Sequence, residues 1–179
     1  MMKLYPIFLC VLAVLLLSCS ERNKTAVEKP VNEWCGKQLV LPAFDCFKLY
    51  ARDSMLYDYS KFEYKSLVVI GKTDCIGCKL NLEKIQSLVC EMDSVSLGRF
   101  GFIFVVEPMY QRELYTILRT HDFVIPVFVD NNREFRKQNE ITDDGSHVFL
   151  LDKQNEIIVI GDPLKNPEVR NTYLKLNYY

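Results

Sequence analysis

Two cysteines, Cys75 and Cys78, lie three positions apart in the stretch Thr73-Asp74-Cys75-Ile76-Gly77-Cys78-Lys79. A Cys-x-x-Cys pair is typical of a redox-active dithiol, in which a thiolate attacks a disulfide. The same pair could instead be half of a zinc site, a static disulfide, or two small core residues in a reducing compartment. The chain has no second Cys-x-x-Cys that would complete a zinc site.

The residues on either side of the pair predict how it is positioned. The continuous apolar run Leu67-Val68-Val69-Ile70 is typical of a strand buried on both faces of a parallel sheet. After the pair, apolar residues recur at spacings of four and three, which is one face of a helix. They are Cys78, Leu82, Ile85, Val89 and Met92. The cysteines are therefore predicted where a buried strand turns into an amphipathic helix.

A helix N-terminus favours an anion, so this position favours a thiolate. Cysteines in such a setting have pKa values lowered from about 8.5 to roughly 3.5–7.5. We expect Cys75 to reach solvent and Cys78 to lie on the buried stripe of the helix. An exposed attacking thiol with a sheltered resolving thiol behind it suits disulfide exchange.

The N-terminus predicts export. One basic residue, Lys3, precedes an apolar stretch from Tyr5 to Leu17, which is shorter than the roughly 20 residues that a transmembrane helix needs. The ending Leu16-Leu17-Ser18-Cys19 resembles the bacterial lipoprotein signal. That resemblance implies a signal peptide over 1–19 and lipidation of Cys19, which would anchor the protein to a membrane of the cell envelope, in the periplasm or facing the surface. An ordinary signal peptide with a chance cysteine is the alternative.

The polar segment 20–33 then reads as a flexible tether, and 34–179 as one globular domain. Of seven cysteines, five remain after Cys10 and Cys19 are set aside. An oxidising compartment allows a second bridge between Cys35 and Cys46, or leaves them unbridged. Cys90 fits a small apolar position at a helix edge. A net charge of −1 without a basic stripe argues against a nucleic-acid partner.

Strands and helices alternate through the rest of the chain. Short strands are expected between Trp34 and Tyr64, before the main sheet. Later strands are predicted at 100–106, 148–152 and 157–160, the last two as a hairpin, with a short strand or extended segment at 123–129. Helices are predicted at 110–119, 131–140 and 167–176, the last with an Asn166 cap.

This order resembles a thioredoxin fold, and more closely the membrane-anchored TlpA-type redoxins. Ile125-Pro126-Val127-Phe128-Val129-Asp130 and the stretch from Phe149 to Ile157 match two motifs of that family, and the resemblance covers Lys61 to Leu176. It implies an α/β fold: a three-layer α/β/α sandwich with a central mixed sheet, here with an N-terminal extension. It also implies a thiol–disulfide oxidoreductase without an organic cofactor, with Cys75 as nucleophile and Cys78 as resolving cysteine. The implied partners are protein thiols or disulfides and a redox partner protein.

The chain departs from the family at two positions. Asp74 stands where the family commonly has Trp, and a carboxylate there would tend to raise the thiol pKa. Ser146, followed by His147, stands where the family has the cis-proline that shapes the substrate groove. The departure opens a second hypothesis, a copper or zinc site formed by Cys75, Cys78 and His147, loosely similar to Sco-type proteins. A third is a thioredoxin-like binding module with an inert disulfide.

Overall fold

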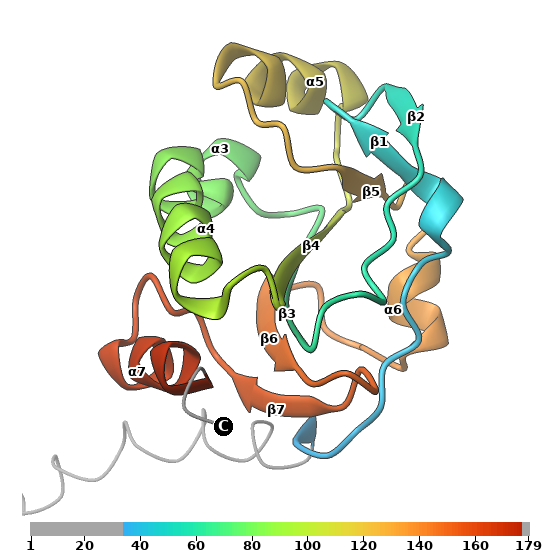
Figure 1. Cartoon of the computed structure of the whole chain (residues 1–179). Coiled ribbons are helices and arrows are strands. Elements are labelled where there is room, and N and C mark those ends of the chain that lie inside the picture. The colour runs from blue at the N-terminus through green and yellow to red at the C-terminus, as the bar shows by residue number, and fades with distance from the viewer. Residues whose placement is uncertain (1–33, 177–179) are drawn as a thin grey trace, which may run out of the picture. The chain divides into compact units, whose positions relative to one another are not determined.

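The computed structural model describes residues 34–176. The predicted signal peptide, the tether and Cys19 lie outside these residues. Within the unit from Cys35 onward, seven strands form one sheet in the order β2-β1-β5-β4-β3-β6-β7 (Figure 1). The strands are β1 (Phe47–Leu49), β2 (Asp53–Met55), β3 (Tyr64–Ile70), β4 (Phe100–Val106), β5 (Val127–Val129), β6 (His147–Leu151) and β7 (Ile157–Ile160).

The sheet is mixed, as predicted. β3 pairs in parallel with β4, from Tyr64 opposite Phe100 to Ile70 opposite Val106, and β4 pairs in parallel with β5. All other neighbouring strands are antiparallel, including the predicted β6–β7 hairpin. Every residue of β4 is buried, because both faces of this central strand are covered. The continuous apolar runs at 67–70 and 100–106 reflect that burial.

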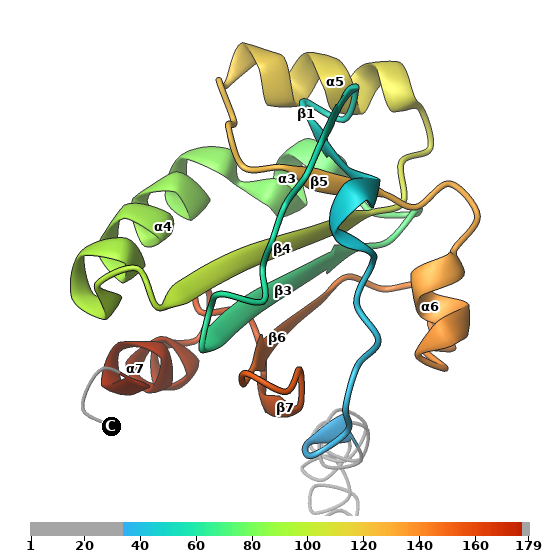
Figure 2. The same cartoon turned by 45° about the vertical axis from the view of Figure 1, so that its right-hand side comes forward.

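Helices cover the sheet on both faces, which gives the predicted three layers (Figures 1 and 2). Helices α3 (Ile76–Leu80), α4 (Leu82–Ser96), α5 (Gln111–Thr120) and α7 (Pro167–Lys175) share one core with the sheet. Helix α6 (Glu134–Gln138) and the chain that precedes β3 cover the opposite face. The α7 cap is confirmed: the Asn166 side chain accepts hydrogen bonds from the backbone N–H groups of Glu168 and Val169, with Pro167 at the first position.

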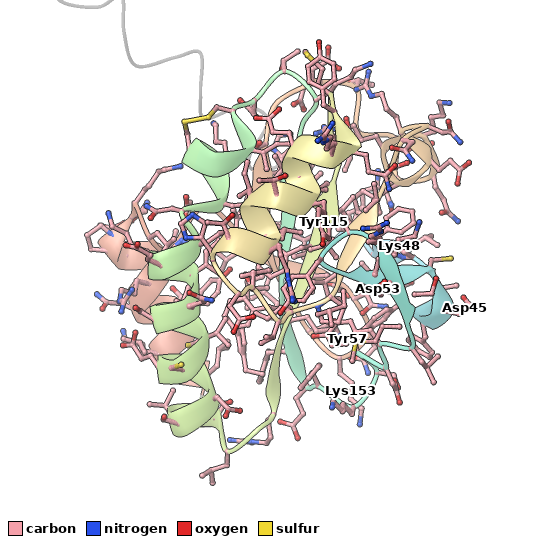
Figure 3. The ribbon with its side chains drawn as sticks, turned by 90° about the horizontal axis from the view of Figure 1, so that it is seen from above. Asp45, Lys48, Asp53, Tyr57, Tyr115 and Lys153 are labelled. Atoms are coloured by element: carbon pink, nitrogen blue, oxygen red, sulfur yellow. A yellow bond between two sulfur atoms is a disulfide. The ribbon has the colours of Figure 1, made fainter. Side chains whose placement is uncertain are left out.

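The N-terminal extension completes the sheet beyond β5. A short 3₁₀ turn (Phe44–Cys46) leads into the β1–β2 hairpin, and β1 pairs antiparallel with β5. The ring of Phe47 packs edge-on against Tyr57, which Figure 3 labels in this part of the molecule. Burial raises the pKa of Tyr57 to about 12, and its hydroxyl donates to the Phe102 carbonyl oxygen. None of the helices within residues 34–176 has the length and apolar character needed to cross a membrane.

Candidate active site

The two cysteines of the Cys-x-x-Cys pair form a disulfide at the start of α3, with their Cα atoms 5.3 Å apart. Figure 3 shows this bond in yellow. After β3 the chain turns sharply, and the Asp74 N–H donates to the Gly71 carbonyl oxygen at 3.1 Å. Cys75 is then the N-cap residue of α3, and its Sγ accepts a hydrogen bond from the Cys78 N–H at 3.3 Å. The strand-to-helix position predicted from the sequence is confirmed.

Both cysteines are exposed, so the prediction that Cys78 lies on the buried stripe is wrong. In α3 the buried positions belong to Ile76 and Leu80 instead. The reason is a break at Asn81, which adopts a left-handed conformation with φ of 37° and separates α3 from α4. The predicted apolar face begins only after this break, in α4. The helical spacing of that face therefore does not place Cys78, which lies in α3, on the same side.

Ser146 lies directly beside the turn that carries the cysteines. Its Oγ accepts a hydrogen bond from the Gly71 N–H at 3.2 Å and donates to the Asp74 carboxylate. The resemblance placed Ser146 at the position of a groove-shaping proline that faces the dithiol. The structure brings Ser146 to the residue immediately before Cys75.

The approach of these two loops depends on Gly71. A Cβ atom at this position would lie 2.0 Å from the Asp144 carbonyl oxygen, a distance that real Cβ atoms do not adopt. Because the obstructing atom belongs to the backbone, the loop itself would have to move. Gly71 therefore permits the contact between Ser146 and Asp74.

Asp74 is held in its ionised form. Its carboxylate accepts the Ser146 hydrogen bond and lies 3.5 Å from the Lys79 ammonium. The Ser146 hydrogen bond and the Lys79 charge hold the pKa of Asp74 below its ordinary value, and together they exceed the opposing effect of partial burial. A fixed negative charge thus precedes Cys75 in the chain.

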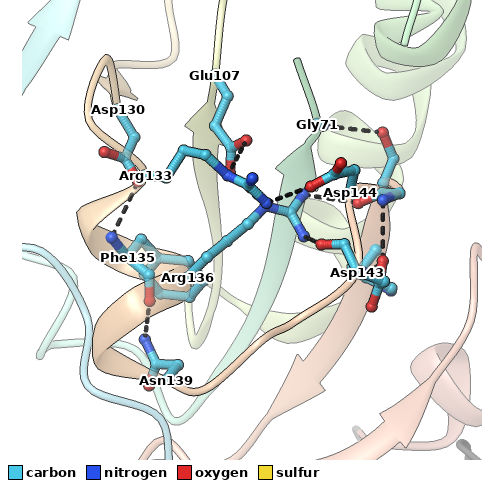
Figure 4. Close-up of polar contacts among 12 residues, drawn as sticks. Gly71, Glu107, Asp130, Arg133, Phe135, Arg136, Asn139, Asp143 and Asp144 are labelled. Carbon is cyan, nitrogen blue, oxygen red and sulfur yellow. Dashed lines mark hydrogen bonds and ion pairs between the residues drawn. The ribbon is translucent and has the colours of Figure 1, made fainter. Parts of the chain in front are cut away.

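A buried ion pair holds the loop that ends at Ser146 (Figure 4). The Arg136 guanidinium in α6 contacts the Glu107 carboxylate, which follows β4, and both side chains are almost completely buried. The same guanidinium donates to the carbonyl oxygens of Asp143 at 2.8 Å and Gly145 at 2.6 Å. Arg133 lies 3.5 Å from Glu107 and also contacts Asp144. Neither Arg136 nor Glu107 was identified from the sequence.

His147 is directed to a carboxylate. Its Nε2 lies 2.7 Å from Asp143 Oδ1, and its ring stacks on Phe149. Within residues 34–176, no three side chains of the metal-binding types are placed to hold an ion. The structure therefore gives no support to a metal site formed by Cys75, Cys78 and His147.

Ser146 and His147 line a surface pocket of about 170 Å³. The pocket also borders Lys79, the residue after Cys78, and it extends to the end of β7 and the turn that follows. The remaining lining residues are Val68, Val69, Ile70, Val148, Ile160, Gly161, Asp162 and Lys165. The role of Ser146 and His147 in binding a substrate stays a prediction. A substrate that they bind would occupy this pocket.

The structure contains no bridge between Cys35 and Cys46. Cys46 is a free, exposed thiol whose Sγ lies 3.7 Å from Asp45. Cys46 directly precedes β1 near one edge of the sheet, whereas Cys35 lies at the other edge, with its Sγ 3.9 Å from the Ile158 carbonyl oxygen in β7. The nearness of the two cysteines in sequence is not preserved in the fold. Cys90 is exposed on α4 and is also a free thiol.

Comparison with solved structures identifies the same fold in redox proteins. The chain superposes on the thioredoxin domain of a thiol-disulfide oxidoreductase from Bacteroides vulgatus with a TM-score of 0.56, 13% identity, and coverage of 79% of this chain and 96% of that one. For a domain of a putative thiol-disulfide oxidoreductase from Bacteroides thetaiotaomicron the values are 0.54, 14%, 78% and 95%. Peroxiredoxin Q from Xanthomonas campestris gives 0.54, 13%, 78% and 95%.

No protein-family model matches the sequence, and neither does any curated protein. At these identities the structural neighbours show a common fold and nothing about substrate. The described residues have a thioredoxin-like fold with a Cys-x-x-Cys disulfide at the start of α3.

Proposed function

We propose that this protein is a lipid-anchored thiol–disulfide oxidoreductase of the cell envelope that acts through Cys75 and Cys78. The observation that carries the proposal is the exposed Cys75–Cys78 disulfide at the N-terminus of α3 on a thioredoxin-like fold. An exposed pair at this position can exchange with a disulfide of another protein.

Exchange in the reducing direction proceeds in two steps. The Cys75 thiolate attacks one sulfur of the substrate disulfide, that bond breaks, and the first substrate sulfur leaves as a thiolate. The Cys78 thiolate then attacks Cys75 Sγ and releases the second substrate sulfur. Two electrons pass from the dithiol to the substrate, and a dithiol of a redox partner protein must then reduce the Cys75–Cys78 disulfide and become a disulfide itself. The N–H of Cys78 donates to Cys75 Sγ, which supports Cys75 as the attacking thiolate.

The chemistry is tested by the equilibrium between the full-length protein and glutathione. Differential alkylation followed by mass spectrometry reports the Cys75–Cys78 pair separately from the other cysteines. We expect a reversible two-electron transition between about −270 and −120 mV, together with reduction of insulin disulfides that is lost in Cys75→Ser and retained in the control Cys46→Ser. A pair that stays oxidised below about −300 mV would instead be a structural disulfide in a binding module.

The anchor is supported by the sequence Leu16-Leu17-Ser18-Cys19. It is tested by feeding radiolabelled palmitate to bacteria that express the full chain. Label is expected in the wild-type protein and absent from Cys19→Ser, with Cys10→Ser as the matched control. Equal labelling of the wild type and Cys19→Ser would refute the anchor without affecting the proposal for the dithiol.

A further inference from the structure

A carboxylate is fixed immediately before the N-cap cysteine of α3. Asp74 is tied to this place from two sides, by the Ser146 hydroxyl from the loop before β6 and by the Lys79 ammonium from α3. The turn back to Gly71 fixes its backbone as well. A surface carboxylate without such contacts would be free to move into solvent, where its field is screened. The Asp74 carboxylate is instead fixed on the residue directly before Cys75, the proposed nucleophile.

We propose that Asp74 sets the direction of exchange: its fixed negative charge disfavours the Cys75 thiolate and makes the reduced dithiol an electron donor to protein disulfides. The inference rests on the proposed function and deepens it, because it assigns a substrate class and a direction. Substrate disulfides are reduced, and the Cys75–Cys78 pair is oxidised. The reaction that precedes this one must then deliver two electrons from a stronger thiol reductant.

Whether Asp74 makes the pair a stronger or a weaker electron donor depends on which redox state of the pair carries a negative charge. Only the reduced pair contains a thiolate, so a nearby negative charge destabilises the reduced pair and leaves the disulfide unaffected to first order. A less stable reduced form gives up its electrons more readily, as the converse case shows: a strongly oxidising dithiol is one whose reduced form is stabilised. The hydrogen bond from the Cys78 N–H acts in the opposite sense and favours the thiolate.

Other charges around Asp74 modify its effect. Lys79 lies on α3 and partly neutralises the carboxylate, while Lys72 is exposed in the turn. The loop before β6 contributes Asp143, whose carboxylate is bonded to His147. Asp74 therefore disfavours the Cys75 thiolate and Lys79 favours it. Removing the two charges one at a time should shift the Cys75 pKa and the reduction equilibrium of the pair in opposite directions. A purely structural role of the Asp74–Lys79 contact would move both variants in the same direction.

The experiment compares the full-length wild type with Asp74→Asn, Asp74→Glu and Lys79→Gln. Asparagine can keep the contact with Ser146 while it removes the charge. After chemical reduction, the pH dependence of iodoacetamide alkylation at Cys75 gives the thiol pKa, read by mass spectrometry. Equilibration with glutathione then gives the reduction equilibrium of the pair. Asp93→Asn, an exposed carboxylate on α4, is the matched control.

We expect Asp74→Asn to shift the alkylation midpoint to lower pH by roughly one unit and to make the disulfide about tenfold easier to reduce. Lys79→Gln should shift both readouts the other way, and Asp74→Glu and Asp93→Asn should resemble the wild type. Equal midpoints in the wild type and Asp74→Asn would overturn the role of Asp74, as would shifts of the same sign in Asp74→Asn and Lys79→Gln. Failure of the proposed function looks different: the alkylation midpoints could still separate, but the wild-type pair would not exchange with glutathione.

Discussion

Arg136 and Glu107 form an ion pair in the interior of the protein, with side chains only 1% and 2% exposed. Their sequence positions lie in α6 and directly after β4, so the pair joins the layer opposite α4 to the central strand. The guanidinium also binds two carbonyl oxygens of the loop that ends at Ser146. The pair therefore holds the loop that ends at Ser146, the residue that contacts Asp74.

Arg136→Ala is expected to destabilise the protein strongly. Removing one partner of a buried ion pair leaves the other charge buried without compensation, which typically costs about 3–5 kcal/mol. Urea unfolding monitored by circular dichroism measures the change in the free energy of unfolding. The exposed Arg112 on α5 provides a control, and Arg112→Ala should change stability by no more than about 0.5 kcal/mol. If the two variants were equally stable, the buried pair would not contribute to the free energy of unfolding as expected.

Replacing both charged residues with apolar ones separates the contribution of the two charges to stability from that of the volume that the side chains fill. Arg136→Met combined with Glu107→Leu removes both charges and retains apolar volume, so it should recover part of the stability that Arg136→Ala loses. The two loop carbonyl oxygens would still lack their donor. We therefore expect incomplete recovery of stability and a less ordered 143–146 loop, which hydrogen exchange at its backbone amides would detect.

Gly71→Ala is expected to disturb the dithiol. The new Cβ would lie 2.0 Å from the Asp144 carbonyl oxygen, so the loop before β6 must move away and the contact between Ser146 and Asp74 is lost. The alkylation midpoint of Cys75 should then change. Gly98→Ala is the matched control: Gly98 has a positive φ of 78° but no atom within 4 Å of its Cβ position. It should cost about 1 kcal/mol of stability and leave the Cys75 midpoint unchanged.

The continuous apolar strands could be predicted because their signal is local. Leu67–Ile70 and Phe100–Val106 are buried on both faces, and four to seven consecutive apolar residues bounded by turns indicate that environment. The cap of α7 was equally local, since Asn166 and Pro167 combine a side-chain acceptor with a favourable first helical residue.

The exposure of Cys78 could not be predicted from helical spacing alone. One residue, Asn81, leaves the right-handed helical conformation and changes the phase between α3 and α4. Asparagine tolerates this left-handed conformation, and Asn81 could have been recognised as a helix start before Leu82. Counting apolar residues across it treated two helices as one.

The Arg136–Glu107 pair had no local signal. The two residues are 29 positions apart, and neither lies in a motif with a characteristic spacing. Arg136 lies in the polar stretch 131–140 that predicts a short helix, yet its side chain is buried. Charge patterning describes surfaces well, but a buried ion pair depends on which elements the fold brings together.

The stability contributed by Asp74 should depend on pH in a defined direction. The pKa of Asp74 is lowered from 3.8 in the folded protein, chiefly by the Ser146 hydrogen bond. Its contribution is therefore fully present above the unfolded value and is lost as pH falls through the folded value. The wild type should be more stable than Asp74→Asn near neutral pH, and the difference should shrink below about pH 4. Thermal unfolding of both proteins across this range tests it, and a difference that is independent of pH would contradict it.

The assignment of Cys75 as nucleophile predicts which single variant captures a substrate. Exposure does not decide between the cysteines, because both are exposed. Cys75 is assigned because it is the N-cap residue of α3 and its Sγ accepts the hydrogen bond from the Cys78 N–H. Cys78→Ser retains the attacking thiolate but cannot resolve the mixed disulfide, so it should accumulate a covalent complex with a reducible protein substrate such as insulin. Cys75→Ser should form much less of this complex.

Non-reducing electrophoresis and mass spectrometry of the linked peptide identify the sulfur that is bound. The comparison is made in a Cys46→Ser background, which removes one exposed thiol that could form the same kind of adduct. Complex formation through Cys78 in Cys75→Ser, at a rate equal to that of Cys75 in Cys78→Ser, would reverse the argument. The backbone hydrogen bond would then be too weak to distinguish the sulfurs, and Asp74 would act on a dithiol in which either cysteine can attack.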